Sequence, residues 1–182
     1  MIGSRNIWRL DRQTLIWPFI ASVLYALVTW ATNVIVAPGL PSLRPGSVIP
    51  ILSGVLFGPI AGFVVGVAGR AVADILTFGL FWNWDISNGF TGLVAGLTPL
   101  MCAGVQRGWR WAGAATVLGA LGVIMGSGFA ALTDIWVANL QPDLAISTEW
   151  LPVAQWDLAL GLPLTVGVLI AWQRLQRRAQ QL

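Results

Sequence analysis

Long apolar runs without charge are the feature that most constrains this chain. No Asp, Glu, Lys or Arg lies between Arg12 and Arg44, and similar uncharged stretches recur along the 182 residues. Charged residues make up only 9% of the sequence, against about 25% in soluble domains. The sequence therefore predicts an integral membrane protein. Because the runs are continuous rather than alternating at every second residue, helices are favoured over a membrane β-barrel.

The length of the chain limits the number of membrane spans. A helix needs about 20 apolar residues to cross the hydrocarbon core, which leaves room for about six spans with short loops. We therefore expect one all-α membrane domain of six transmembrane helices, formed by residues 14–172 between a tail of residues 1–13 and a basic tail of residues 173–182. The expected spans cover residues 14–36, 48–57, 60–78, 88–105, 112–136 and 152–172.

The distribution of charge predicts the orientation of this bundle. Arginines gather on one side of the six-span arrangement, and acidic residues fall near the other side. By the positive-inside rule the arginine side is cytoplasmic, so both termini are expected in the cytoplasm. The arginines are Arg5, Arg9, Arg12, Arg107, Arg110, Arg174, Arg177 and Arg178, and the acids are Asp85, Asp134, Asp143, Glu149 and Asp157.

The composition excludes several kinds of chemistry. One Cys and no His exclude an intramolecular disulfide, a Cys/His zinc or haem site and a Ser-His-Asp system. Proton transfer would then depend on carboxylates, and these show no recognisable paired motif. An intramembrane enzyme using Asp residues is therefore the remote alternative. We expect a binding and transport protein without catalytic residues, bound metal, cofactor or nucleic-acid partner.

Charges inside the predicted third span mark a candidate site. Arg70 and Asp74 lie one turn apart on the same helical face, and an unpaired charge at mid-membrane costs at least about 2.5–3.5 kcal/mol. The two residues form either a structural ion pair or the floor of a cavity open to the outside. Asp134 and Asp157 could face the same cavity, or they could lie at helix ends exposed to water.

Tryptophan is abundant at both predicted membrane boundaries. The outer loops combine Trp82, Trp84 and Trp136 with acidic or amide side chains, among them Asp85 and Asn88. This pattern is typical of an aromatic belt, but it also fits the mouth of a ligand site.

Small residues recur at intervals of four and predict close helix packing. Gly54, Gly58 and Gly62 form one such series in the second and third spans. In the first span, Ser22 and Ala26 form a small-xxx-small pair that either packs inside the bundle or docks a partner protein.

An ordered set of motifs between Leu43 and Leu97 resembles the substrate-binding S components of energy-coupling factor (ECF) vitamin transporters, and the riboflavin-type group in particular. The set combines an Arg-Pro pair, a Leu-Phe-Gly-Pro turn, two glycine-rich spans and a Trp-containing segment between them. In order, these are Arg44-Pro45, Leu56-Phe57-Gly58-Pro59, Gly62/Gly66/Gly69, Trp82/Trp84 and Gly89/Gly92/Gly96.

The resemblance implies a six-helix protein of a prokaryotic plasma membrane that captures a vitamin from outside and hydrolyses nothing. Its implied partners are a transmembrane coupling protein and two cytoplasmic ATPases, besides membrane lipid. The family docks through an Ala-xxx-Ala pattern in the first span, which here is Ser22 and Ala26. Arg70 stands where the family often has an acidic residue or His.

The resemblance also places the ligand site in the outer half of the bundle, beneath the loops after the first, third and fifth spans. Tryptophan faces there suit a flat heterocycle, and riboflavin is the first expectation. Thiamine or its precursor fits the acidic outer face through cation–π contact, and cobalamin is a further alternative, although no His could ligate cobalt. The expected substrate-binding residues are Arg44, Arg70, Asp74, Trp82, Trp84, Asp85, Asn88, Asp134 and Trp136.

Overall fold

The computed structural model describes residue 8 and residues 12–35, 44–77, 79–102 and 108–179. These residues form helices and connecting turns, and no strand occurs among them. The longer helices of the first part are α1 (Arg12–Ile35), α2 (Val48–Phe57), α3 (Pro59–Thr77), α4 (Trp82–Ala95) and α6 (Gly108–Val137), with the short η1 (Pro45–Ser47) and α5 (Thr98–Met101). The last helical run comprises α7 (Pro142–Leu144), η2 (Ala145–Trp150), α8 (Leu151–Trp156), η3 (Asp157–Gly161) and α9 (Leu162–Ala179).

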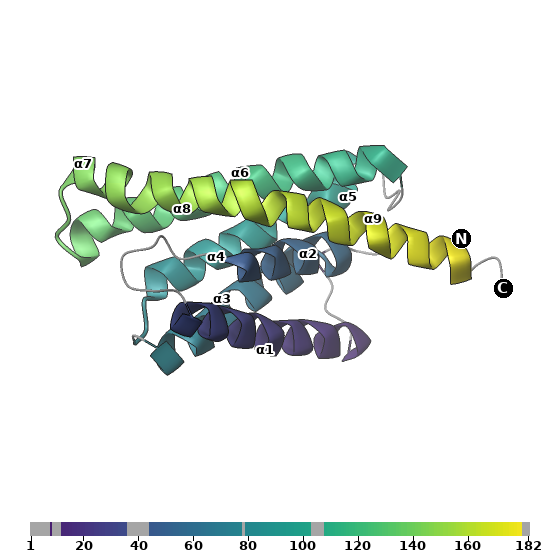
Figure 1. Ribbon diagram of the computed structural model, residues 1–182, viewed down its shortest axis with the longest axis horizontal. Coiled ribbons are helices and arrows are strands. Elements are labelled where there is room, and N and C mark those ends of the chain that lie inside the picture. Colours follow the sequence, from purple (N-terminus) through teal and green to yellow (C-terminus); the bar gives the residue numbers. More distant parts are fainter. Residues whose placement is uncertain (1–7, 9–11, 36–43, 78, 103–107, 180–182) are drawn as a thin grey trace.

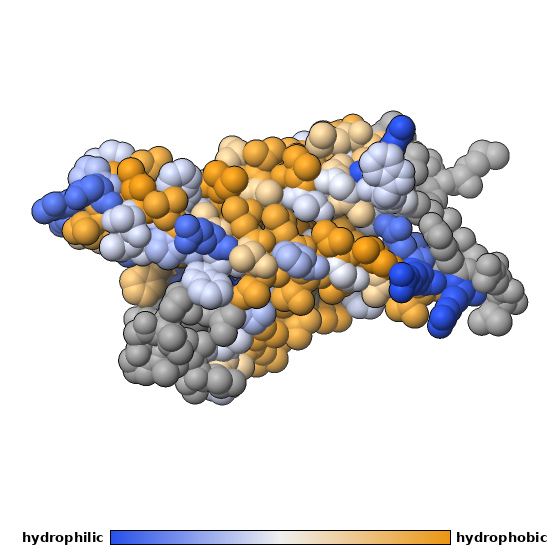
Figure 2. Space-filling view, turned by 45° about the horizontal axis from the view of Figure 1, so that its top comes forward, coloured by the Kyte–Doolittle hydropathy of each residue, from blue (hydrophilic) through white to orange (hydrophobic). Residues whose placement is uncertain are grey.

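Within the described part of the chain, four helical segments are long and apolar enough to cross a membrane. They are Leu15–Thr32, Pro59–Thr77, Gly108–Val137 and Pro142–Gln176, and a shorter apolar helix covers Pro45–Phe57. Figure 2 shows hydrophobic side chains over the middle of one face and hydrophilic side chains toward the two ends of the molecule. The expectation of an all-α multi-pass membrane protein is therefore confirmed. The count of six spans stays a prediction, because α2 and α4 are shorter than the bilayer requires.

The helices are stacked so that α2 and α4 lie between two pairs of longer helices (Figure 1). The last helical run lies beside α6 on one side, and α3 with α1 lies on the other. The start of α1 and the end of α9 lie at the same end of the molecule (Figure 1). This arrangement agrees with the prediction that both termini are on one side of the membrane, but it does not identify that side.

Glycine lets α4 approach its neighbours backbone to backbone. A Cβ at Gly54 or Gly62 would overlap the Gly92 carbonyl oxygen, and one at Gly66 would overlap the carbonyl oxygen of Asn88. On the opposite side of α4, a Cβ at Gly122 of α6 would lie 2.7 Å from the Thr91 carbonyl oxygen. The glycine series therefore packs helices within the bundle, as its spacing predicts.

Two segments expected to be loops are helical. The Trp-rich segment before Asn88 forms the first turns of α4, which begins at Trp82, and the polar segment of residues 137–151 is helical from Pro142 onward. Both segments carry polar residues that lower their hydropathy. In α4 these residues turn inward and are buried, as at Asn83 and Ser87, so low hydropathy there reflects a polar interior and not a loop. The expected fourth span also ends early, at Ala95.

Candidate functional site

The first turns of α4 place a row of polar side chains inside the bundle. Asn83, Asp85 and Asn88 are all buried, and the Asp85 side chain is only 2% exposed. Trp84 is half-buried among them. Because α4 lies between α3 and α6, this row is accessible to side chains from both neighbouring helices.

Asp134 of α6 holds the start of α4 through both of its carboxylate oxygens. The Asn83 amide donates to Oδ1 at 2.7 Å, and the Trp84 indole Nε1–H donates to Oδ2 at 2.8 Å. The same Asn83 amide nitrogen also donates to the Thr133 hydroxyl at 3.1 Å. With both oxygens bonded, Asp134 fixes the orientation of the Trp84 ring.

Arg44 brings a positive charge to the same ring. Its guanidinium carbon lies 5.7 Å from the centroid of the Trp84 ring, within the range of a cation–π contact. Asp157 of η3 is buried, interacts electrostatically with Arg44 and lies within hydrogen-bonding reach of the Ser47 side chain. A turn of π-helix thus brings an acidic residue of the last helical run to the segment that precedes α2.

An ion pair closes the other side of the row. Arg70 Nη2 lies 2.9 Å from Asp74 Oδ1, with the Arg70 side chain 13% exposed and Asp74 fully buried. The pairing expected from the i,i+4 spacing is confirmed. Asp85 lies within hydrogen-bonding reach of Asp74, and the Tyr25 hydroxyl of α1 donates to Asn88 Oδ1 at 2.7 Å.

These contacts define what we call the buried polar cluster. Its hydrogen bonds and charges connect helices α1, α3, α4 and α6 with the segment that precedes α2 and with the last helical run. Asp74 Oδ1 is satisfied by the ion pair with Arg70, but Asp85 Oδ1 and Asp157 Oδ1 are buried with neither a hydrogen bond nor an ion pair among the described residues. Its members are Tyr25, Arg44, Arg70, Asp74, Asn83, Trp84, Asp85, Asn88, Asp134 and Asp157.

Most of the residues expected to bind substrate lie in this cluster, with two exceptions. Trp136 is 73% exposed near the end of α6, and Trp82 is 47% exposed at the start of α4. Of the cluster members, Tyr25 is one that the sequence pattern did not indicate. Tyr25 is the single Tyr in the chain, and that is the signal that could have identified it.

The pair expected to dock a partner lies toward the interior. Ala26 is buried, and the Ser22 hydroxyl donates to the Pro18 carbonyl of its own helix at 2.8 Å. A Cβ at Gly69 of α3 would lie 2.8 Å from the Ser22 carbonyl oxygen. These contacts favour internal packing against α3 over docking, the two interpretations that the sequence left open.

Comparison with protein families gives one match that spans most of the chain. The model described as ECF-type riboflavin transporter, S component, matches residues 18–173. That range contains every member of the buried polar cluster. No solved structure matches the chain.

Proposed function

Because this chain belongs to the family of ECF-type riboflavin transporter S components, we propose that it binds riboflavin at the buried polar cluster. The bound vitamin would be released into the cell chemically unchanged, since the family is one of transporter subunits and not of enzymes. The proposal concerns the identity of the ligand and the place where it binds.

The observation that carries the proposal is the environment of Trp84. The Arg44 guanidinium carbon lies 5.7 Å from the centroid of its ring, and a ligand stacked on this face would take the place of the guanidinium, which is itself a flat electron-poor group. The isoalloxazine ring of riboflavin is such a group. Asp134 holds the indole through its Nε1–H, which presents the ring in a fixed orientation and lowers the entropy lost on stacking.

The unpartnered carboxylate oxygens suit the rest of riboflavin. Asp85 Oδ1 and Asp157 Oδ1 are buried acceptors without a donor among the described residues, and a buried acceptor left unsatisfied costs about 1–3 kcal/mol. The ribityl chain carries several hydroxyl donors that could satisfy both.

One observation favours thiamine as a second candidate. The buried polar cluster holds four buried carboxyl groups, those of Asp74, Asp85, Asp134 and Asp157, but only two guanidinium groups. If the carboxyl groups are ionised, this excess of negative charge attracts a cationic heterocycle. It also disfavours a phosphate ester of either vitamin, because a further negative charge would enter a site with too few cations.

Transport requires partners that the chain itself does not supply. We propose that they are the transmembrane coupling protein and two cytoplasmic ATPases that the S-component family implies. The described residues of this chain provide helices for binding and packing, and the partners would supply the energy for uptake.

The test is a titration of the purified protein in detergent with riboflavin, thiamine and cobalamin, read by tryptophan fluorescence. Riboflavin should quench the emission at one molecule per chain. Trp84→Ala should weaken binding by roughly two- to twelvefold for the loss of about 0.5–1.5 kcal/mol of ring contact. The matched control is Trp109→Ala, because Trp109 is 81% exposed at the start of α6.

The outcomes separate the candidates. Binding of thiamine without riboflavin would replace the proposed ligand by the second candidate. Binding that is insensitive to Trp84→Ala would move the site away from the buried polar cluster. Unchanged emission with all three vitamins would contradict the proposed function.

A further inference from the structure

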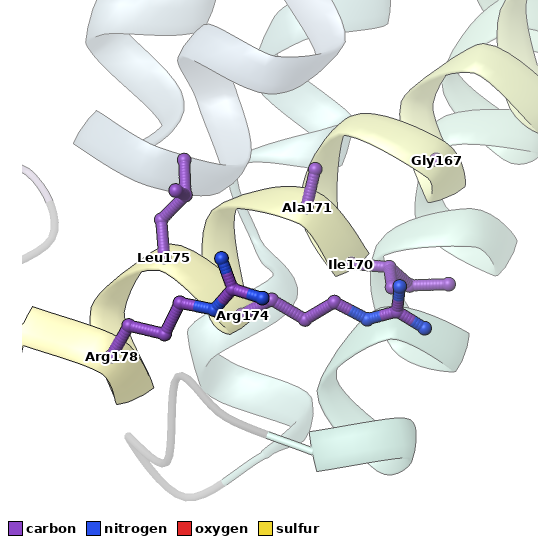
Figure 3. Close-up of a pocket in the computed structure, with 6 residues that line it drawn as sticks. All are labelled: Gly167, Ile170, Ala171, Arg174, Leu175 and Arg178. Atoms are coloured by element: carbon purple, nitrogen blue, oxygen red, sulfur yellow. The ribbon is translucent and has the colours of Figure 1, made fainter. Parts of the chain in front are cut away.

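The outer surface of α9 carries a groove whose lining changes along the helix from apolar to basic. The groove has a volume of about 330 Å³, and the lining residues drawn in Figure 3 all belong to this helix. The lining residues are Gly167, Ile170, Ala171, Arg174, Leu175 and Arg178.

Helical spacing explains the shape of the groove. Gly167, Ala171, Arg174 and Arg178 follow one another at intervals of four, three and four residues, so they lie on one face of the helix. The first two have little or no side chain, and a Cβ at Gly167 would meet nothing within 4 Å. The small residues form a trough, and the arginines stand at the end of it.

This face points away from the bundle. Thr165 and Leu169 of α9 are fully buried, and at about 100° per residue they lie on the side opposite Gly167 and Ala171. The groove therefore opens toward the lipid that surrounds a membrane-spanning helix.

The two arginines at the end of the trough have no counter-ion on their own helix. Both side chains are exposed, and no ion pair is formed by either within the described residues. The sequence contains no Asp or Glu after Asp157. Their positions differ by one helical turn, a rise of about 6 Å, so both guanidinium groups can reach a single phosphate.

We propose that this groove binds one anionic phospholipid. The headgroup phosphate lies between Arg174 and Arg178, and an acyl chain follows the trough past Ala171 to Gly167. The apolar span that includes α9 extends to Gln176, so the arginines stand at the level of the headgroups while the trough lies in hydrocarbon. Basic sites at the cytoplasmic ends of membrane helices attract anionic lipid, and that is the end at which this helix is expected to lie.

One anionic lipid accounts for both the exposed arginines and the apolar trough. Free phosphate would satisfy the guanidinium groups but would leave the trough empty. A partner protein would need carboxylates opposite the arginines as well as an apolar ridge. We therefore assign the groove to a lipid and treat the other occupants as outcomes of the test.

The test is native mass spectrometry of the full chain with phosphatidylglycerol or phosphatidylcholine, together with thermal unfolding in the same lipids. Phosphatidylglycerol should be retained preferentially and should raise the unfolding temperature. Arg174→Gln with Arg178→Gln should weaken its retention by about thirtyfold, since each arginine contributes about a factor of five at a membrane surface. Gly167→Leu with Ala171→Leu should fill the trough and also reduce retention. Arg110→Gln, a neutralisation at the start of α6, is the matched control and should change neither readout.

Three results would overturn the proposal. Equal retention of the two lipids would show that the headgroup charge is not recognised. If lipid retention fell in the arginine variant but not in the trough variant, and inorganic phosphate raised the unfolding temperature as much as phosphatidylglycerol, the site would be a phosphate contact only. Unchanged lipid retention combined with loss of the coupling protein on co-purification would assign the groove to a protein interface.

Discussion

A substitution that breaks the Arg70–Asp74 ion pair of α3 should destabilise the protein more than a single substitution elsewhere in the buried polar cluster. Arg70→Ala leaves Asp74 fully buried without the guanidinium that lies 2.9 Å from its Oδ1. Asp74→Ala leaves the Arg70 guanidinium without its carboxylate, but its side chain is 13% exposed and keeps some access to water. Arg70→Ala should therefore be the more damaging of the two.

The size of the effect follows from this burial. Removing one partner of a buried pair costs about 3–5 kcal/mol, and we place Asp74→Ala near the lower bound and Arg70→Ala near the upper. For a chain of this length, that corresponds to a fall of roughly 6–20 °C in the unfolding temperature. The double variant removes both charges, so it should recover part of the loss and leave mainly the cost of a cavity.

The assay is a double-mutant cycle read by thermal unfolding in detergent, followed by a riboflavin titration of each folded variant. A double variant that folds but binds weakly would place the pair in the ligand site. Full recovery of stability with unchanged affinity would make the pair purely structural. Losses that add without any recovery would refute the reasoning, because they would show that the two residues do not stabilise one another.

Three further predictions concern packing, hydrogen bonding and orientation. Gly66→Ala should cost about 1–3 kcal/mol of stability, because its Cβ overlaps backbone of α4. Gly113→Ala, where nothing lies within 4 Å, should cost nothing, and equal effects in thermal unfolding would contradict the packing. Tyr25→Phe should cost about 0.5–1.5 kcal/mol through loss of its bond to the α4 asparagine, and an unchanged unfolding temperature would count against that bond. In a Cys102→Ala background, the thiol of Arg178→Cys should resist a membrane-impermeant maleimide added to intact cells but react after permeabilisation, and labelling from outside would reverse the predicted orientation.

The sequence was sufficient to predict features that depend on local spacing. Uncharged runs predicted helices that cross a membrane, and glycine at intervals of four predicted close packing. The i,i+4 spacing of Arg70 and Asp74 predicted their ion pair, which the structure forms at 2.9 Å. Each of these features depends on neighbours along one helix or on a requirement of the bilayer that applies to every span.

Features that depend on tertiary burial were harder to predict. Hydropathy marked the start of α4 as a loop, because the polar residues that face the interior resemble loop residues in composition. Asp134 and Asp157 could be exposed helix ends or cluster members until the neighbouring helices were placed. Trp84 and Trp136 are indistinguishable in sequence terms, yet one is held by Asp134 and the other is 73% exposed.

The central claim is that the buried polar cluster binds riboflavin and leaves it unchanged. Mass spectrometry of small molecules retained by the purified protein tests this claim most directly, with an Asp85→Asn variant prepared in parallel. We expect intact riboflavin at one molecule per chain in the original protein and a reduced amount in the variant. Retention of a different or chemically altered molecule, or equal riboflavin in both preparations, would contradict it.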